Sequence, residues 1–430
     1  MLTAAIGFAA AFALIFSRVP IAVALLLIGF AGFATLSGLM PSLSMIAASA
    51  RDSVLSYNLA VIPLFVLMGN LVAGAGISQD LFRAAQVLIG RRRGGLAMAT
   101  IVASGGFGAI CGSSVATALT IGKVSLPSMK KYGYSEGLST AAVAAGGTLG
   151  ILIPPSVIMV VYGVSTETHI GKLFMAGIIP GIIGVLGYMA AVRWVVWRDP
   201  SAAPITEKIP KEERKGLFKG LVPVIVLFGL VLGGIYGGLF TPTEASGIGA
   251  FGAFLFALNR RVLTRDAIRS ILSDSAQTTA MMFAILLGAT VFGEFINLTG
   301  VHKALLEVVQ DASLEPFTVI LIIIGVYIVL GCILESLSII LLTVPLLFPV
   351  VVGLGYDPVW FGIIVVVATE IGLITPPIGI NLFVIQSLVP NLKLSTLVRG
   401  IVPFVTVDIV RILLLAAVPA LSLWLPNRMF

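Results

Sequence analysis

Long apolar stretches with only brief interruptions cover most of this chain and constrain its fold more than any other feature. A helix that crosses the hydrocarbon core of a membrane needs about 20 mostly apolar residues. The stretches lie at about 2–17, 20–40, 54–76, 95–127, 138–165, 173–197, 219–240, 242–258, 276–299, 317–352, 358–389 and 400–424. Only 10% of the 430 residues are charged, which excludes an ordinary soluble domain, where the share is about 25%. The sequence therefore predicts an all-α polytopic membrane protein.

The positive charges lie mostly in the connections between apolar stretches, a distribution typical of cytoplasmic loops. If the first span runs from outside to inside, the predicted cytoplasmic segments contain every Lys and Arg except Arg51, Lys172, Lys303, Arg411 and Arg428. This topology places both termini outside. Because it also accounts for the net charge of +7, we predict no nucleic-acid partner, and the spans are expected to contact membrane lipid.

No pattern typical of an enzyme occurs in the sequence. The histidines, His169 and His302, lie near predicted outer loops, and the cysteines, Cys111 and Cys332, lie in apolar stretches. HExxH, CxxC, GxSxG and P-loop patterns are all missing. We therefore expect no enzymatic activity, no disulfide, no organic cofactor and no ATP hydrolysis, so that active transport by this chain would depend on an ion gradient.

Two apolar stretches are too long for one straight span and carry polar residues at their centre. The stretch 95–127 contains Gly112-Ser113-Ser114, and the stretch 317–352 contains Glu335-Ser336. We interpret both as re-entrant helical hairpins, whose tips lie at membrane depth.

Two further stretches are interrupted by paired prolines. Pro154-Pro155 divides 138–165, and Pro376-Pro377 divides 358–389. Because proline has no amide hydrogen and its ring clashes with the preceding turn, a helix must open there. Both stretches are predicted to be discontinuous spans.

An internal repeat relates the two halves of the chain. Adding 222 to a residue number maps Pro20 to Pro242, Ser114 to Ser336, Gly133-Tyr134 to Gly355-Tyr356, Gly150 to Gly372 and Pro154-Pro155 to Pro376-Pro377. With five full crossings in each half, an odd number, the second half would enter the membrane upside down. We therefore predict two inverted repeats, at 1–197 and 219–430, joined by a charged cytoplasmic linker at 198–218.

The four predicted breaks carry the chemistry. Backbone groups without helical partners are tolerated at membrane depth only where they line a site, and freed carbonyls and hydroxyls are suitable ligands for sodium. In inverted-repeat transporters such breaks point helix N-termini at an anionic substrate while unwound carbonyls hold the coupling cation. The simplest interpretation is two cation sites that flank one substrate site.

Single side chains at the breaks leave alternatives open. The hydroxyls of Ser113, Ser114, Thr117, Ser156, Ser336 and Thr375 either bind ligands or bond back to their own helices. Glu335 is favoured as a site residue, with capping of nearby amides as the alternative. Glu370 either serves the site or holds its broken helix together, and Asn381 either contacts substrate or braces the helix. Arg411 either extends to an interface or pairs with Asp408.

Several of these stretches resemble the DctM-like large membrane subunit of tripartite ATP-independent periplasmic (TRAP) transporters. The most specific are GFGAICGSSVATALTIGKVSLPSMKKYGY (106–134), AAGGTLGILIPPSVIMVVYG (144–163), LFMAGIIPG (173–181), ESLSIILLTVPLLFPVV (335–351) and EIGLITPPIGINLFV (370–384). The resemblance covers nearly the whole chain.

The resemblance implies an elevator-type, sodium-coupled importer of organic anions such as dicarboxylates or sugar acids. It also implies scaffold spans at about 1–76 and 219–299 and transport elements at about 95–165 and 317–389. It implies a bacterial inner-membrane location with periplasmic termini, delivery of substrate by a periplasmic binding protein, and a separate small subunit of four spans. Carried over by position, one sodium site would use Cys111, Ser113, Gly150, Ile153 and Pro155, and the other Ile333, Glu335, Gly372, Thr375 and Pro377. The substrate contacts would be Ser114, Ser156, Ser336 and Asn381.

Other classes remain as alternatives. An ion or proton antiporter or symporter of related architecture, acting without a binding protein, would be expected to have more than one obligatory buried acid; only Glu335 and Glu370 qualify, and both lie in one half. A membrane-embedded enzyme would require a nucleophile with its base or a paired acid and base, and neither is present. A passive channel is less suited to paired hairpins that open on opposite sides.

Overall fold

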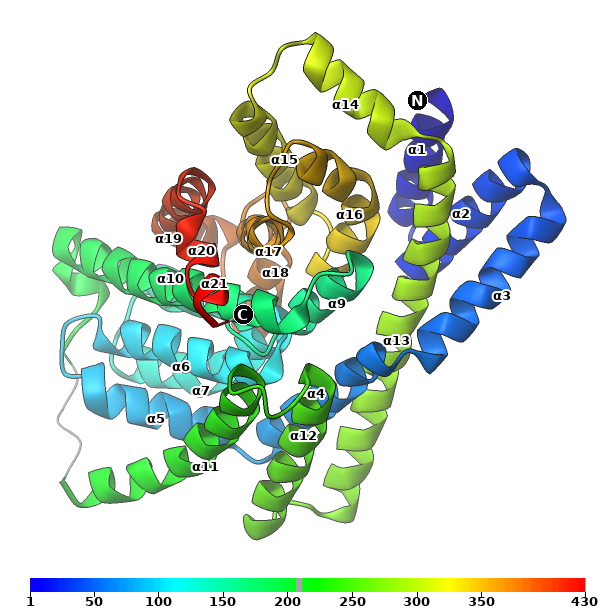
Figure 1. The fold of residues 1–430 in the computed structure, drawn as a ribbon. Helices are drawn as coiled ribbons and strands as arrows, with labels where there is room; N and C mark the ends of the chain where they lie inside the picture. Colours follow the sequence, from blue (N-terminus) through cyan, green and yellow to red (C-terminus); the bar gives the residue numbers. More distant parts are fainter. Residues whose placement is uncertain (206–210, 430) are drawn as a thin grey trace.

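The computed structural model describes the backbone of residues 1–205 and 211–429, and the side chains of these ranges except 211–220 and 223. These residues form helices, and no strand occurs among them. Figure 1 shows the arrangement. The elements up to residue 205 are α1 (Leu2–Phe16), α2 (Ile21–Ser37), α3 (Leu39–Leu55), η1 (Tyr57–Ala60), α4 (Val61–Gly74), α5 (Ile77–Ile89), α6 (Gly95–Cys111), α7 (Ser114–Lys131), α8 (Glu136–Leu152), α9 (Val157–Ser165), α10 (Ile170–Arg198) and η2 (Pro200–Ala202).

The elements from residue 211 onward follow a similar order. They are α11 (Lys211–Tyr236), α12 (Pro242–Asn259), α13 (Arg265–Leu298), α14 (Val301–Asp311), α15 (Pro316–Gly331), α16 (Ser336–Gly353), α17 (Pro358–Leu373), α18 (Ile380–Leu388), α19 (Leu394–Ala417), α20 (Ala420–Leu423) and α21 (Pro426–Met429). Each predicted apolar stretch overlaps at least one of these helices, which confirms the all-helical prediction for the described residues.

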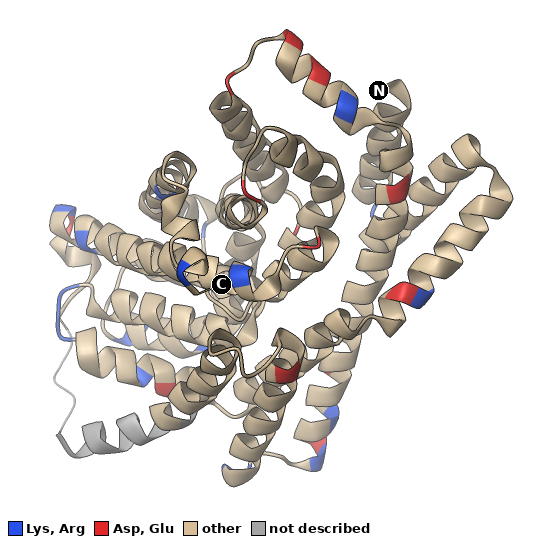
Figure 2. Cartoon of the chain, viewed as in Figure 1, with Lys and Arg blue, Asp and Glu red and all other residues tan. Residues whose placement is uncertain are grey.

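Several helices are suited to cross a membrane by length and composition. Within the described ranges, five are long and apolar enough: η1 with α4, α10, α13, α16 and α19. The pair α8 and α9, bent by 42°, provides a sixth, and six further apolar helices have 10–17 residues. Charged residues lie mainly near helix ends and in connections (Figure 2). The number of crossings in each half stays a prediction.

All four predicted breaks are present in the structure. The helix pairs α6 and α7, and α15 and α16, are each interrupted at the expected polar residues. The pairs α8 and α9, and α17 and α18, are interrupted at the paired prolines, where both Pro-Pro peptide bonds are cis. The order of helix, polar break, helix, helix, Pro-Pro break and helix therefore occurs twice along the chain.

Local signals at corresponding positions start the two discontinuous helices. Ser135 precedes α8, and its hydroxyl accepts a hydrogen bond from the Leu138 N–H at 3.4 Å. Asp357, 222 residues later, precedes α17, and its carboxylate accepts from the Val359 N–H at 2.7 Å. Such caps satisfy amide groups that have no helical acceptor. Almost every residue of both helices is buried, so α8 and α17 form the centre of the molecule.

Glycines allow the backbones of neighbouring helices to touch next to the breaks. A Cβ atom on Gly108 of α6 would lie 2.3 Å from the Cα atom of Gly150 in α8. A Cβ atom on Gly372 of α17 would lie 2.3 Å from the Cα atom of Gly331 in α15. Because real Cβ contacts are never this short, no larger residue fits without moving a helix.

The long helix α13 lies between α1–α3 on one side and the broken elements on the other (Figure 1). It packs against α2, α3, α4 and α16. Glycines again permit close packing, since a Cβ on Gly29 of α2 would lie 2.6 Å from the backbone N of Phe292 in α13. This helix therefore connects the N-terminal helices with the second helix–break–helix element.

Three sequence-based boundaries differ from the structure. Residues 39–55 form α3, which the apolar stretches did not predict. Helix α13 begins at Arg265, well before the predicted apolar start at 276. The proposed linker, 198–218, overlaps helix α11, which begins at Lys211, while residues 206–210 lie outside the described residues.

Candidate functional site

A cavity of about 340 Å³ lies between the two polar breaks. Its walls come from the tips between α6 and α7 and between α15 and α16, and from α4, α8, α9 and α13. The lining residues include Cys111, Gly112, Ser113, Ser114, Glu335, Ser336, Asn70, Thr278, Met281 and Met282. The fold thus brings two tips that are more than 200 residues apart in sequence to one cavity, which we call the tip cavity.

Two helices begin at the tip cavity. Helix α7 starts at Ser114, and the Ser113 hydroxyl at its N-cap accepts from the Ala116 N–H at 3.4 Å. Helix α16 starts at Ser336, and Glu335 at its N-cap makes no side-chain cap bond; its carboxylate instead accepts from the Ser338 hydroxyl at 3.4 Å. Since helix N-termini carry partial positive charge, both starts favour an anion in the cavity.

The predicted substrate residues divide into two groups. Ser114 and Ser336 line the tip cavity, whereas Ser156 and Asn381 are not among its lining residues. The buried Ser156 hydroxyl donates to the Ile151 carbonyl at 2.5 Å and accepts from the Met159 N–H at 3.3 Å, so it closes the Pro-Pro break and caps α9. Asn381 is buried and donates to the Ala144 carbonyl of α8 at 3.4 Å, which agrees with the bracing alternative.

The residues of the first predicted sodium site lie close together. Gly150 faces the first tip, where a Cβ on it would lie 3.3 Å from the Ser113 carbonyl oxygen. A Cβ on Gly112 would lie 3.6 Å from the Pro155 carbonyl oxygen. The backbone of the first polar break therefore lies next to Gly150 and to the first Pro-Pro break, which also contains Ile153.

The second predicted set shows a similar arrangement. The N–H of Gly379, at the end of the second Pro-Pro break, donates to the Cys332 carbonyl at 3.0 Å and so connects that break to the second tip. The hydroxyl of Thr375 donates to the Ile371 carbonyl at 2.6 Å, and Ile333 and Pro377 lie within the two breaks. The described residues contain no group of three or more His, Cys, Asp or Glu side chains placed to hold a metal.

Two cavity residues were missed by sequence reasoning. Asn70 of α4 lies in the wall and donates to the Ser275 hydroxyl of α13 at 2.8 Å, and Thr278 of α13 lies in the same wall. A polar residue inside each apolar stretch was the only sequence signal for them.

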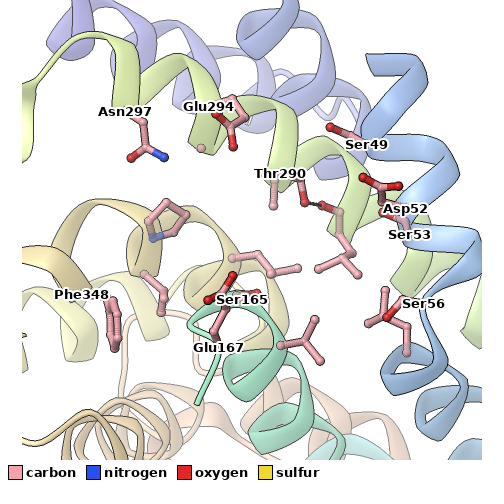
Figure 3. Close-up of a pocket in the computed structure, with 18 of the residues that line it drawn as sticks. Ser49, Asp52, Ser53, Ser56, Ser165, Glu167, Thr290, Glu294, Asn297 and Phe348 are labelled. Carbon is pink, nitrogen blue, oxygen red and sulfur yellow. Dashed lines mark hydrogen bonds between the residues drawn. The ribbon is translucent and has the colours of Figure 1, made fainter. Parts of the chain in front are cut away.

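A second cavity, of about 570 Å³, lies between α3, α13, α16 and the end of α9 (Figure 3). Asp52 of α3, Glu167 after α9 and Glu294 of α13 surround it, with Ser49, Thr290 and Asn297 between them. Its lining includes no Lys, Arg or His. We call it the acidic crevice; its charge favours cations and disfavours anions.

A fully buried ionic cluster lies beside the broken helices. Arg411 of α19 pairs with Glu370 of α17 at 2.7 Å and with Asp408 of its own helix at 2.9 Å. Arg411 is only 2% exposed, so the alternative in which it extends to an interface is wrong and the predicted pairing with Asp408 is confirmed. Tyr188 of α10 donates to the Asp408 carboxylate at 2.5 Å.

The overall fold matches that of membrane transporters. The Alcanivorax borkumensis YdaH transporter, 15% identical in sequence, superimposes with a TM-score of 0.64 over 90% of each chain. Together with the apolar helices, this similarity defines the class by its fold, an all-helical fold shared with that membrane transporter.

The family follows from sequence comparison. A model of the DctM component of tripartite ATP-independent periplasmic transporters matches residues 8–421. The C4-dicarboxylate TRAP transporter large permease protein DctM of Pseudomonas aeruginosa PAO1 is 35% identical, over 93% of each chain. The sialic acid TRAP transporter large permease protein SiaM of Vibrio cholerae is 32% identical, over 96% of each chain. The chain belongs to the DctM family, as its sequence indicated, and these relatives are named as permeases, in agreement with the expectation of no enzymatic activity.

Proposed function

We propose that this chain is the large permease of a sodium-coupled importer of an organic anion, in the chemical range of C4-dicarboxylates and sugar acids. One observation carries the proposal. The tip cavity has mostly apolar walls with polar groups at the two tips, where two helices begin, but its lining residues include no Lys, Arg or His, while Glu335 is acidic. Because a carboxylate substrate requires compensating positive charge away from water, bound cations at the adjacent breaks are the most economical source of it.

We assign one sodium ion to each polar break with its Pro-Pro break. The first site would use Cys111, Ser113, Gly150, Ile153 and Pro155, largely through carbonyls, and the second Ile333, Glu335, Gly372, Thr375 and Pro377. Ser114 and Ser336 would contact the substrate from the two helix starts. The contacts of Ser156 and Asn381 favour support of the breaks over substrate binding for those two residues.

The repeated order of elements supports an inverted-repeat architecture with elevator-type movement. In this proposal the transport elements, about 95–165 and 317–389, move against scaffold spans at about 1–76 and 219–299. The repeats would be 1–197 and 219–430, and their connection at 198–218 and the positive loops would face the cytoplasm, with both termini periplasmic. The position of α13 between the two groups of helices agrees with a role as the scaffold surface (Figure 1).

The family supplies the expected partners. We propose a multi-pass position in the bacterial inner membrane, a separate small subunit of four spans, and a periplasmic binding protein that delivers the substrate. The relatives named for C4-dicarboxylates and sialic acid define the substrate range to test first.

The deciding experiment measures uptake of radiolabelled succinate and sialic acid into proteoliposomes that contain this chain, its small subunit and its binding protein. We expect uptake that requires both an inward sodium gradient and the binding protein. Glu335→Gln should raise the sodium concentration needed for half-maximal uptake. Glu307→Gln, an exposed position on α14 outside both cavities, is the matched control and should leave it unchanged.

Two results would overturn the proposal. Uptake driven by protons alone would favour the ion or proton antiporter or symporter alternative. Uptake independent of the binding protein would favour a conventional symporter that takes substrate directly from solution.

A further inference from the structure

A continuous line of buried polar side chains connects the two discontinuous helices. It starts at Thr148 of α8, whose hydroxyl lies 3.1 Å from the hydroxyl of Tyr188 of α10. Tyr188 donates to Asp408 of α19 at 2.5 Å. Asp408 pairs with Arg411 at 2.9 Å, and Arg411 pairs with Glu370 of α17 at 2.7 Å. We call these five residues the buried polar chain.

The two ends of the buried polar chain occupy corresponding positions. Thr148 lies two residues before Gly150, and Glu370 lies two residues before Gly372. The same offset of 222 that relates the glycines also relates Thr148 to Glu370. Both glycines belong to the proposed sodium sites. Neither Thr148 nor Glu370 lines the tip cavity.

The surroundings isolate the buried polar chain from other charged side chains. All five side chains are buried, with Arg411 the most exposed at 2%. On the four helices that carry the buried polar chain, the other charged residues lie toward the helix ends, at Glu136, Lys172, Arg193, Arg198 and Arg399, while Asp357 and Lys393 precede α17 and α19. Helix α6, which packs against α8 and α10, has none. A buried polar network with few alternatives holds its helices in one relative arrangement.

The packing is shaped around the guanidinium. A Cβ atom on Gly184 of α10 would lie 2.2 Å from Nη1 of Arg411, so the guanidinium fills the space that a side chain would otherwise occupy. The cation also lies over the ring of Tyr188, 5.9 Å from its centroid. Helix α10 therefore contacts the guanidinium of Arg411 through Gly184. Through Tyr188 it also contacts Asp408 of α19 and Thr148 of α8.

We propose that the buried polar chain couples the two cation sites, with Tyr188 and Arg411 as positioning residues. A cation at the first break fixes α8 near Gly150. Through Tyr188, Asp408, Arg411 and Glu370 this arrangement is passed to α17 near Gly372, so the second cation binds to a site that is already ordered. By reciprocity, the second cation assists the first to the same extent. This inference rests on the proposed sodium sites, and it adds a coupling between them.

The test compares two buried tyrosines. Tyr188→Phe removes one hydroxyl and so interrupts the buried polar chain. It leaves every proposed sodium ligand unchanged. Tyr162→Phe is the matched control, because Tyr162 is also 0% exposed. Its hydroxyl donates to the Pro358 carbonyl at 2.7 Å, and Pro358 is not a member of the buried polar chain. Both variants remove one buried tyrosine hydroxyl, which contacts Asp408 and Thr148 in the case of Tyr188 and the Pro358 carbonyl in the case of Tyr162, so Tyr162→Phe controls for the loss of a buried hydroxyl as such.

The readout is the steepness of uptake against sodium concentration in the assay above. In the wild-type protein we expect a Hill coefficient above one. In Tyr188→Phe it should fall toward one, and the half-saturating sodium concentration should rise about fivefold, the low end of typical coupling between sites. Tyr162→Phe should keep the wild-type curve. If Tyr188→Phe fails to fold, Thr148→Val is used instead, because it removes the Thr148–Tyr188 contact by changing Thr148.

Each adverse result has a separate meaning. Wild-type sodium steepness in both Tyr188→Phe and Thr148→Val would overturn the coupling while leaving the proposed function intact. An equal loss of steepness in Tyr162→Phe would show that the buried polar chain acts only as structural support, which overturns the coupling. A simple hyperbolic sodium curve in the wild-type protein would overturn it as well. Uptake without sodium dependence would refute the proposed function, and the coupling with it.

Discussion

Replacing Arg411 with methionine tests how the buried ionic cluster contributes to stability. Methionine keeps much of the volume but removes the guanidinium that lies between Glu370 and Asp408. The side chains of all three residues are at most 1% exposed, so water cannot replace the lost cation. Breaking a buried ion pair by removing one partner costs about 3–5 kcal/mol, because the remaining charge is uncompensated. We expect Arg411→Met to lower the free energy of unfolding by about that amount.

The measurement is unfolding in mixed detergent micelles with increasing sodium dodecyl sulfate, followed by tryptophan fluorescence. Arg260→Met is the control, because Arg260 pairs with Asp80 where the two side chains are 28% and 19% exposed, and such a pair contributes about 0–1 kcal/mol. The triple variant Arg411→Met, Glu370→Gln, Asp408→Asn removes the uncompensated charges and should recover most of the loss. If the single variant stays within about 1 kcal/mol of wild type, or if the triple variant is no more stable than the single one, the charge argument is wrong.

Two further predictions concern the helix contacts and one helix start. Gly372→Ala should reduce both stability and uptake, because its Cβ would meet the backbone of Gly331, whereas Gly325→Ala in α15 meets no atom within 4 Å and should be neutral or slightly stabilising in a thermal melt. Burial, assisted by Lys172, lowers the pKa of His169 below 6.5, and neutral Nδ1 accepts from the Lys172 N–H at 3.2 Å at the start of α10. The stabilising contribution of His169 should therefore be present above pH 6.5 and be lost as the pH falls through the lowered pKa of the folded protein. The stability difference between wild type and His169→Ala should shrink on acidification. A difference that grows at low pH would contradict this reasoning.

The breaks were predictable because their causes are local. Paired prolines cannot continue a helix, and Gly112 adopts a positive φ of 65° at the first tip. Helix α3 was missed because residues 39–55 include Arg51, Asp52 and several serines, and hydropathy detects burial in lipid, not helix formation. For the same reason hydropathy placed the start of α13 too late: its polar first turns extend beyond the apolar stretch.

The composition of the site depended on contacts between distant segments. The pairing of Arg411 with Asp408 follows from a spacing of three residues in one helix, and it was considered from sequence. The pairing with Glu370, 41 residues away, required the packing of α19 on α17. Similarly, the sequence left open whether the hydroxyl of Ser156 binds a ligand or bonds back, and the contact with the Ile151 carbonyl shows that it bonds back.

The backbone contacts at Gly108–Gly150 and Gly331–Gly372 restrict how this permease can change during evolution. Where two main chains touch, no side chain is available to vary, so the geometry next to the breaks is the same for any cargo. The opposite wall of the tip cavity consists of ordinary side chains from α4 and α13, including Asn70, Thr278, Met281 and Met282. In the proposed function the substrate occupies this cavity, so a shift in cargo preference would be recorded in those two helices, and exchanging their four residues between permeases is a direct test of selectivity.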